Sequence, residues 1–99
     1  VKAAVLALCA DGKSQIVRSF NNVGGTISIS YITTGACSID FGFAVNDRYY
    51  MVTAPALEDY PEPVHAVCGM DPGDTTEITC VLQHITGDFL DGYIMIVIY

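Results

Sequence analysis

The sequence is poor in charge, and above all in positive charge. Charged residues make up 15% of the 99 residues, and four lysines and arginines stand against eleven aspartates and glutamates, which gives a net charge of −7. Ordinary soluble domains carry about 25% charged residues. Because nucleic-acid affinity depends on Lys and Arg neutralising phosphates, we expect no binding to DNA or RNA.

Long hydrophobic runs are missing as well. The longest apolar runs, 3–10 and 93–99, are far shorter than the roughly 20 residues that a membrane helix needs, so we expect no membrane insertion. The chain begins with Val1 and has no charged-then-apolar leader, so we interpret it as a mature protein or, in preference, as a piece of a longer one.

Catalytic motifs are also absent. The chain contains no Gly-x-Ser-x-Gly elbow and no Gly-rich phosphate loop before a Lys. Paired acids such as Asp88 and Asp91, or Glu58 and Asp59, would need a cleft that buries one member, and a sandwich of this size has little room for such a cleft. We therefore expect a protein that is not an enzyme and needs no cofactor.

The four cysteines, Cys9, Cys37, Cys68 and Cys80, form no C-x-x-C pair, so neither a redox dithiol nor a zinc ribbon is indicated. Cysteines in strands are often plain buried hydrophobes, and we favour free thiols on this ground. Disulfides are the alternative, and the sequence does not choose among the three possible pairings.

No metal site is expected either. His65 and Cys68 lie three residues apart, which on a strand places them on opposite faces. The acidic turn 71–74 lacks the spacing of oxygen ligands that a calcium loop requires.

The local patterns are those of strands. Short runs rich in β-branched and aromatic residues alternate with turn residues such as Asp11-Gly12 and Gly24-Gly25, and no segment has a capped 3.6-residue period. We predict a single all-β domain over residues 1–99, an antiparallel two-sheet β-sandwich that is jelly-roll-like, with little or no helix. The predicted strands are 2–9, 14–20, 26–32, 37–44, 49–54, 64–68, 75–83 and 93–99.

The two terminal strands are apolar on both faces. In 93–99 the odd-numbered residues are Tyr93, Met95, Val97 and Tyr99, and the even-numbered ones are all Ile. One explanation is a central strand covered by loops. We favour the other, in which one face packs on the domain core and the second contacts another subunit. The predicted interface residues are Val5, Ile94, Ile96, Val97 and Ile98.

Three tyrosines flank a proline-rich loop at 55–63. Tyr49 and Tyr50 precede this loop, and Tyr60 lies within it. A tyrosine combines a flat apolar face with a polar tip, which suits sugars and protein surfaces, and binding often resides in sandwich loops. We predict a receptor-binding surface of Tyr49, Tyr50, Glu58, Asp59 and Tyr60. The alternatives are the 69–74 and 84–92 loops, with Tyr49 and Tyr50 simply alternating into and out of the sandwich.

Several of these segments resemble a module found at the carboxyl end of bacteriophage tail-fibre proteins. The matching features are an apolar first strand (1–5), an Asp-Gly turn at 11–12, and a basic residue before Ser-Phe-Asn in 17–23. Thr34-Gly35 stands where the family has a Thr-Gly turn, and 46–52 contains its Asp-x-x-Tyr-x-Val segment. The resemblance covers about residues 1–54 and 93–99, and the four cysteines depart from it.

The resemblance implies a homotrimeric β-sandwich at a fibre tip, located on the virion and extracellular, which touches a host cell-surface glycan or an outer-membrane protein. It also implies that the chain is the C-terminal part of a longer fibre protein. Two other functions remain open: a capsid decoration or cement protein, and a secreted lectin-like trimeric jelly roll. An upstream fibre stem would favour the fibre tip. A free-standing short gene would favour the decoration protein, and a secretory leader would favour the lectin-like domain.

Overall fold

The computed structural model describes residues 1–62 and 64–99. They form eight strands, and no helix is present among them, hence none long and apolar enough to cross a membrane. All eight predicted strands are present, with ends that differ by a few residues. Their bounds are β1 (Ala3–Cys9), β2 (Gln15–Asn21), β3 (Ser28–Thr33), β4 (Ala36–Asp40), β5 (Tyr50–Thr53), β6 (Val64–Gly69), β7 (Glu77–His84) and β8 (Gly92–Ile98).

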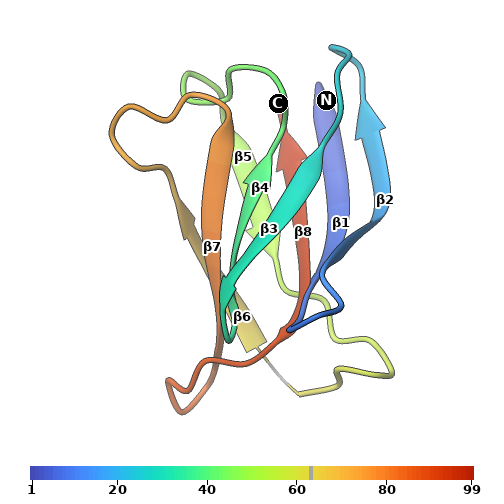
Figure 1. Cartoon of the computed structure of the whole chain (residues 1–99), viewed down its shortest axis with the longest axis vertical. Coiled ribbons are helices and arrows are strands. Elements are labelled where there is room, and N and C mark those ends of the chain that lie inside the picture. The colour runs from blue at the N-terminus through green and yellow to red at the C-terminus, as the bar shows by residue number, and fades with distance from the viewer. Residues whose placement is uncertain (63) are drawn as a thin grey trace.

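The strands form two four-stranded antiparallel sheets that pack face to face (Figure 1). Sheet A has the order β2-β1-β8-β5, and sheet B has the order β3-β4-β7-β6. The all-β two-sheet sandwich is therefore confirmed. Three connections, β1–β2, β3–β4 and β6–β7, are hairpins that stay within one sheet. The strand order of the two sheets therefore differs from that of a jelly roll, which contains two Greek keys.

The core lies between the sheets and follows from alternation along each strand. Sheet A contributes Val5 and the three isoleucines of β8, and sheet B contributes Ile39, Ile78 and Leu82 among others. Each of these side chains is at most 2% exposed. Full burial of such a side chain is worth about 1.5–3 kcal/mol relative to exposure.

This packing corrects most of the predicted subunit interface. Val5, Ile94, Ile96 and Ile98 all lie in the core of the single chain, so their side chains have no surface to offer a second subunit. Val97 alone of the five predicted residues points away from the core and is half-buried. Both faces of β8 are apolar, and only the packing of sheet B against one of them shows which face is the inner one.

The expectation of free thiols is wrong, because all four cysteines are in disulfides. Cys9 on β1 is bonded to Cys37 on β4, which joins the two sheets. Cys68 and Cys80 lie directly opposite each other in the β6–β7 ladder and are bonded to each other. Both pairings depend on strand register and sheet packing, neither of which is visible in the spacing of the cysteines.

Strand β4 ends four residues earlier than predicted, because a turn follows Asp40. The N–H of Gly42 donates to Oδ1 of Asp40 at 2.8 Å, and Gly42 has a φ of +77°, which favours glycine. Phe41 nevertheless remains fully buried. Its ring packs edge-on against Phe43 at a centroid distance of 6.2 Å.

Candidate functional site at the end of the sandwich away from the termini

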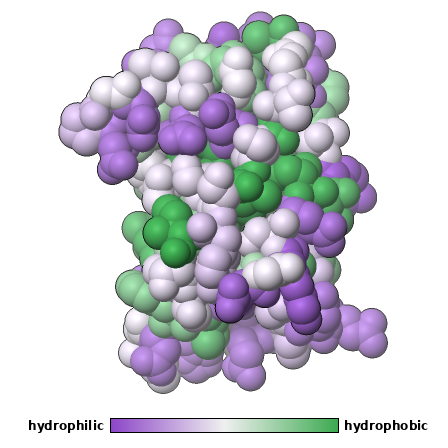
Figure 2. All heavy atoms as spheres, viewed as in Figure 1, coloured by the Kyte–Doolittle hydropathy of each residue, from purple (hydrophilic) through white to green (hydrophobic). Residues whose placement is uncertain are grey.

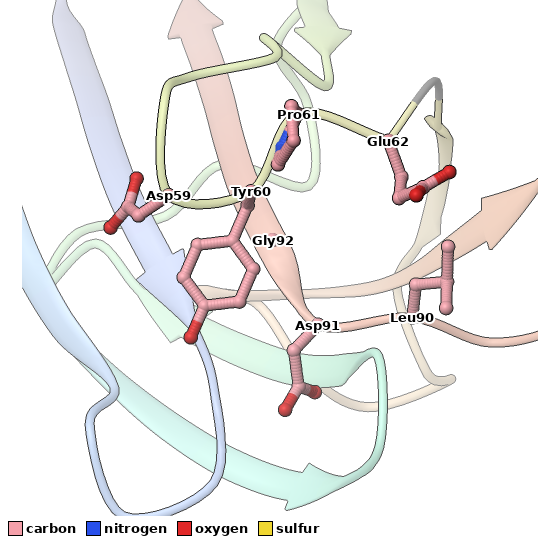
Figure 3. Close-up of a pocket in the computed structure, with 7 residues that line it drawn as sticks. All are labelled: Asp59, Tyr60, Pro61, Glu62, Leu90, Asp91 and Gly92. Carbon is pink, nitrogen blue, oxygen red and sulfur yellow. The ribbon is translucent and has the colours of Figure 1, made fainter.

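Both termini lie at one end of the sandwich, and the β5–β6 and β7–β8 connections reach the opposite end (Figure 1). A pocket of about 260 Å³ lies between these two connections. Figure 3 shows the ring of Tyr60 between the side chains of Asp59 and Asp91. The pocket thus combines an aromatic side chain with three carboxylates. Its lining consists of Asp59, Tyr60, Pro61, Glu62, Leu90, Asp91 and Gly92.

Tyr60 is positioned by a turn and by an aromatic contact. Its N–H donates to the carbonyl of Leu57 at 3.0 Å, which closes the turn 57–60, and Pro61 restricts the backbone that follows. The ring packs edge-on against Tyr93 of β8, at 5.8 Å between centroids and 78° between planes. It covers a small second core of Leu8, Ala10 and Tyr93, which fixes this loop to the outer face of sheet A.

Asp59 is held by the same tyrosine. The hydroxyl of Tyr93 donates to Oδ1 and Oδ2 of Asp59, at 3.1 and 2.9 Å. The hydrogen bond to Asp59 and then burial raise the pKa of Tyr93 above its ordinary value of 10.0. Asp59 and Tyr60, which are consecutive in the loop, therefore both contact Tyr93 of β8 and hold the loop at two points.

Asp91 is hydrogen-bonded to two turns and one strand at this end of the sandwich. Its Oδ1 accepts from the backbone N–H of Gly35 at 2.9 Å and from the hydroxyl of Tyr31 at 3.4 Å. Its Oδ2 accepts from the backbone N–H of Asp11 at 3.2 Å. Because these partners come from β3 and from the β1–β2 and β3–β4 turns, Asp91 is oriented before any ligand arrives.

Glu62 forms the rim of the pocket. Its Oε2 lies 3.6 Å from Nε2 of His84, an ion pair when the histidine is protonated. Glu62 is well exposed, and exposed pairs contribute only about 0–1 kcal/mol, so this carboxylate is free to reorient toward a ligand.

The structure brings together only part of the predicted receptor-binding surface. Asp59 and Tyr60 line the pocket, and Glu58 is exposed beside them in the same turn. Tyr49 lies near the C-terminus instead, since its carbonyl accepts from the N–H of Tyr99. Tyr50 points inward, and its hydroxyl donates to the carbonyl of Cys68 at 3.5 Å. The alternation considered for Tyr49 and Tyr50 is thus confirmed, with one residue packed inside and the other exposed.

The predicted surface did not include the other half of the pocket. Leu90 and Asp91 belong to the β7–β8 connection and Gly92 is the first residue of β8, about thirty residues after Tyr60. The sequence does carry a signal for this segment, because 84–92 is predicted to be a loop at an end of the sandwich, where binding often resides. What it lacks is any indication that the two loops meet.

The pocket can accept hydrogen bonds from a polar ligand and pack against its apolar surface. Within residues 1–62 and 64–99, no group of three or more His, Cys, Asp or Glu side chains is arranged to hold a metal ion. Cys68, considered beside His65 as a metal ligand, is in a disulfide. In comparisons with known proteins, no family model, curated protein or solved structure matches this chain.

Proposed function

We propose that this chain is a virion attachment domain, a homotrimeric phage tail-fibre tip that binds a host cell-surface glycan in the Tyr60 pocket. The observation that carries the proposal is the pocket itself, an aromatic ring between oriented carboxylates at the end of the sandwich away from the termini. The resemblance of residues 1–54 and 93–99 to tail-fibre tips supplies the biological setting.

The chemistry of the pocket suits a sugar ring. A sugar presents an apolar face, which packs on an aromatic side chain, and hydroxyl groups, which donate to carboxylates. Small-molecule sites are generally apolar hollows with a few well-placed polar groups. The volume of about 260 Å³ is just below their usual range of about 300–1,000 Å³, so we expect a single sugar unit to be bound. Because Asp59 and Asp91 are already held by other hydrogen bonds, little order has to be gained on binding.

The charge of the chain favours neutral glycans. Three carboxylates line the pocket and the chain carries a net charge of −7, so phosphate-rich glycans are repelled.

The position of the pocket suits attachment. In a fibre protein the stem would join at Val1, and the pocket lies at the far end of the sandwich from that residue (Figure 1). The pocket would therefore face the host. The two disulfides agree with a domain that works outside a reducing cytoplasm.

The same disulfides also favour a second candidate, a secreted lectin-like domain that uses the same pocket. Inhibition of phage adsorption by the added chain distinguishes the two functions. A fibre tip added in excess as the isolated chain should block adsorption of the phage that carries it, whereas a secreted lectin should bind glycans and leave phage adsorption unchanged.

Binding is tested with matched tyrosine variants. Saturation-transfer NMR with glucose, galactose and mannose, and with glucose 6-phosphate as the anionic comparison, should show contact with a neutral sugar only. Tyr60→Ala should weaken that binding about tenfold, as loss of an aromatic contact worth about 1.5 kcal/mol predicts. Tyr49→Ala is the control, since Tyr49 is 87% exposed at the opposite end.

Because Tyr60 also covers Leu8 and Tyr93, its variant must first be shown to melt cooperatively. Glu62→Gln provides a second variant, since it changes the rim without uncovering apolar groups. Undiminished binding by a folded Tyr60→Ala chain, or equal loss in Tyr49→Ala, would place the site elsewhere.

A further inference from the structure

The outer face of sheet A is almost free of charge. Strand register places Phe20, Ala4, Val97 and Met51 in one row across this face. The next row contains Arg18 of β2, the one charged residue in the four strands of the sheet. We define the apolar patch as Ala4, Leu6, Phe20, Met51, Met95 and Val97.

Sheet B differs on its outer face. There the outward positions include Ser28, Ser30 and Ser38, together with Asp40 and Glu77. In Figure 2, seen from the side on which Figure 1 places β3 and β7 in front, white and purple atoms predominate, and green atoms form a band from the centre to the right edge and smaller groups elsewhere. The outer face of sheet B therefore mixes polar and charged side chains with exposed apolar ones such as Ile32 and Val67, whereas the outer face of sheet A carries Arg18 as its one charge.

The apolar patch is exposed in the single chain. Phe20 is 51% exposed and Met51 is 60% exposed. A shallow groove of about 270 Å³ runs beside Phe20, with Leu6, Arg18 and Met95 among its lining residues. Farther along the same face the chain covers itself, since Tyr60 packs over Leu8 and Tyr93. The apolar patch begins where this cover ends.

The distribution of charged residues indicates which partner covers the apolar patch. Arg18 forms no ion pair with any of the residues that the structure describes. All eleven acids of the chain lie outside the strands of sheet A, in sheet B or in the loops. On a second copy of the chain, carboxylates of sheet B or of the loops are therefore available to pair with Arg18.

From these observations we infer that the apolar patch on sheet A is the surface through which each copy of the chain packs on the next in a closed ring. An isologous contact would bring the patch of one copy onto the same patch of another and place two Arg18 side chains near each other. A ring uses a heterologous contact, in which the patch meets a different surface of the neighbour. The inference rests on the homotrimer of the proposed function and names its interface.

Sedimentation equilibrium of the 99-residue chain tests the inference. The wild-type chain should have a mass three times 10.6 kDa at micromolar concentration. Phe20→Asp and Met51→Asp should each sediment as a folded monomer, because both side chains are exposed in the single chain. Arg18→Gln should weaken assembly about tenfold and reduce its dependence on salt.

Ile32→Asp is the matched control. Ile32 is 56% exposed, as large and apolar as the patch residues, and lies on β3 of sheet B. This variant should remain trimeric. A trimer that survives both Phe20→Asp and Met51→Asp would overturn the interface, and a wild-type dimer or monomer would overturn the ring. If the wild-type chain is monomeric but binds sugar, the interface inferred here is wrong, whereas sugar binding in the Tyr60 pocket is still supported.

Discussion

The hydroxyl of Tyr93 donates to both carboxylate oxygens of Asp59, at 3.1 and 2.9 Å, although the two residues are 34 positions apart in the chain. The contact joins the β5–β6 connection to β8. Since Tyr60 packs on the same ring, the position of the aromatic wall of the pocket depends on Tyr93. One strand residue thus places the two loop residues on which the proposed binding depends.

Alkaline titration should reveal this contact. The hydrogen bond to Asp59, followed by burial, raises the pKa of Tyr93 in the folded chain above 10.0. The stabilisation is therefore complete below the unfolded pKa and is lost as the pH rises through the higher folded pKa. Tyrosinate absorbance should include a late-ionising component from Tyr93, and Asp59→Asn should move the pKa of Tyr93 down toward 10.0. An identical titration curve for Asp59→Asn would contradict the assignment.

Gly35 should tolerate no side chain. Its φ is +72°, and a Cβ there would lie 2.8 Å from the carbonyl oxygen of Leu90 and 2.9 Å from that of Leu82. Its N–H is also the donor to Asp91. We expect Gly35→Ala to lower the free energy of unfolding by more than about 2 kcal/mol, measured by urea denaturation.

Gly12→Ala is the control for this prediction. Gly12 has a similar φ of +68° but nothing within 4 Å of an added Cβ. Gly12→Ala should therefore lower the free energy of unfolding only by the cost of holding a non-glycine residue at a positive φ, about 1 kcal/mol. Equal losses in the two variants would show that the contacts with Leu90 and Leu82 contribute nothing.

The two disulfides should stabilise the fold to different extents. Cys9–Cys37 closes a loop of 28 residues and Cys68–Cys80 a loop of 12. Chain-entropy arguments assign them about 3.6 and about 2.8 kcal/mol respectively. The double variant Cys9→Ala/Cys37→Ala should therefore melt at a lower temperature than Cys68→Ala/Cys80→Ala. The reverse order, with both variants folded, would contradict the entropy argument.

Much of the strand pattern is determined by the sequence alone. Alternation such as Ile27, Ser28 and Ile29 specifies which side chains can be buried, because a strand repeats every two residues. Turn residues then mark the strand ends, and Asp11-Gly12 between β1 and β2 is one example, with Gly12 at a positive φ. The tyrosine-bearing loop could also be recognised, since Tyr60 stands among prolines and acids.

Tertiary structure decided what alternation leaves open. Ile96 and Val97 are equally apolar, and only the packing of sheet B on one side of β8 made Ile96 core and left Val97 on the outer face. The disulfide between Cys9 and Cys37 required the two sheets to meet. The pocket required the loops of Tyr60 and Asp91 to reach the same end of the sandwich, a relation that depends on strand order and not on local propensity. Contacts between residues far apart in sequence come from register and sheet packing, and the amino-acid pattern within any one strand carries no record of them.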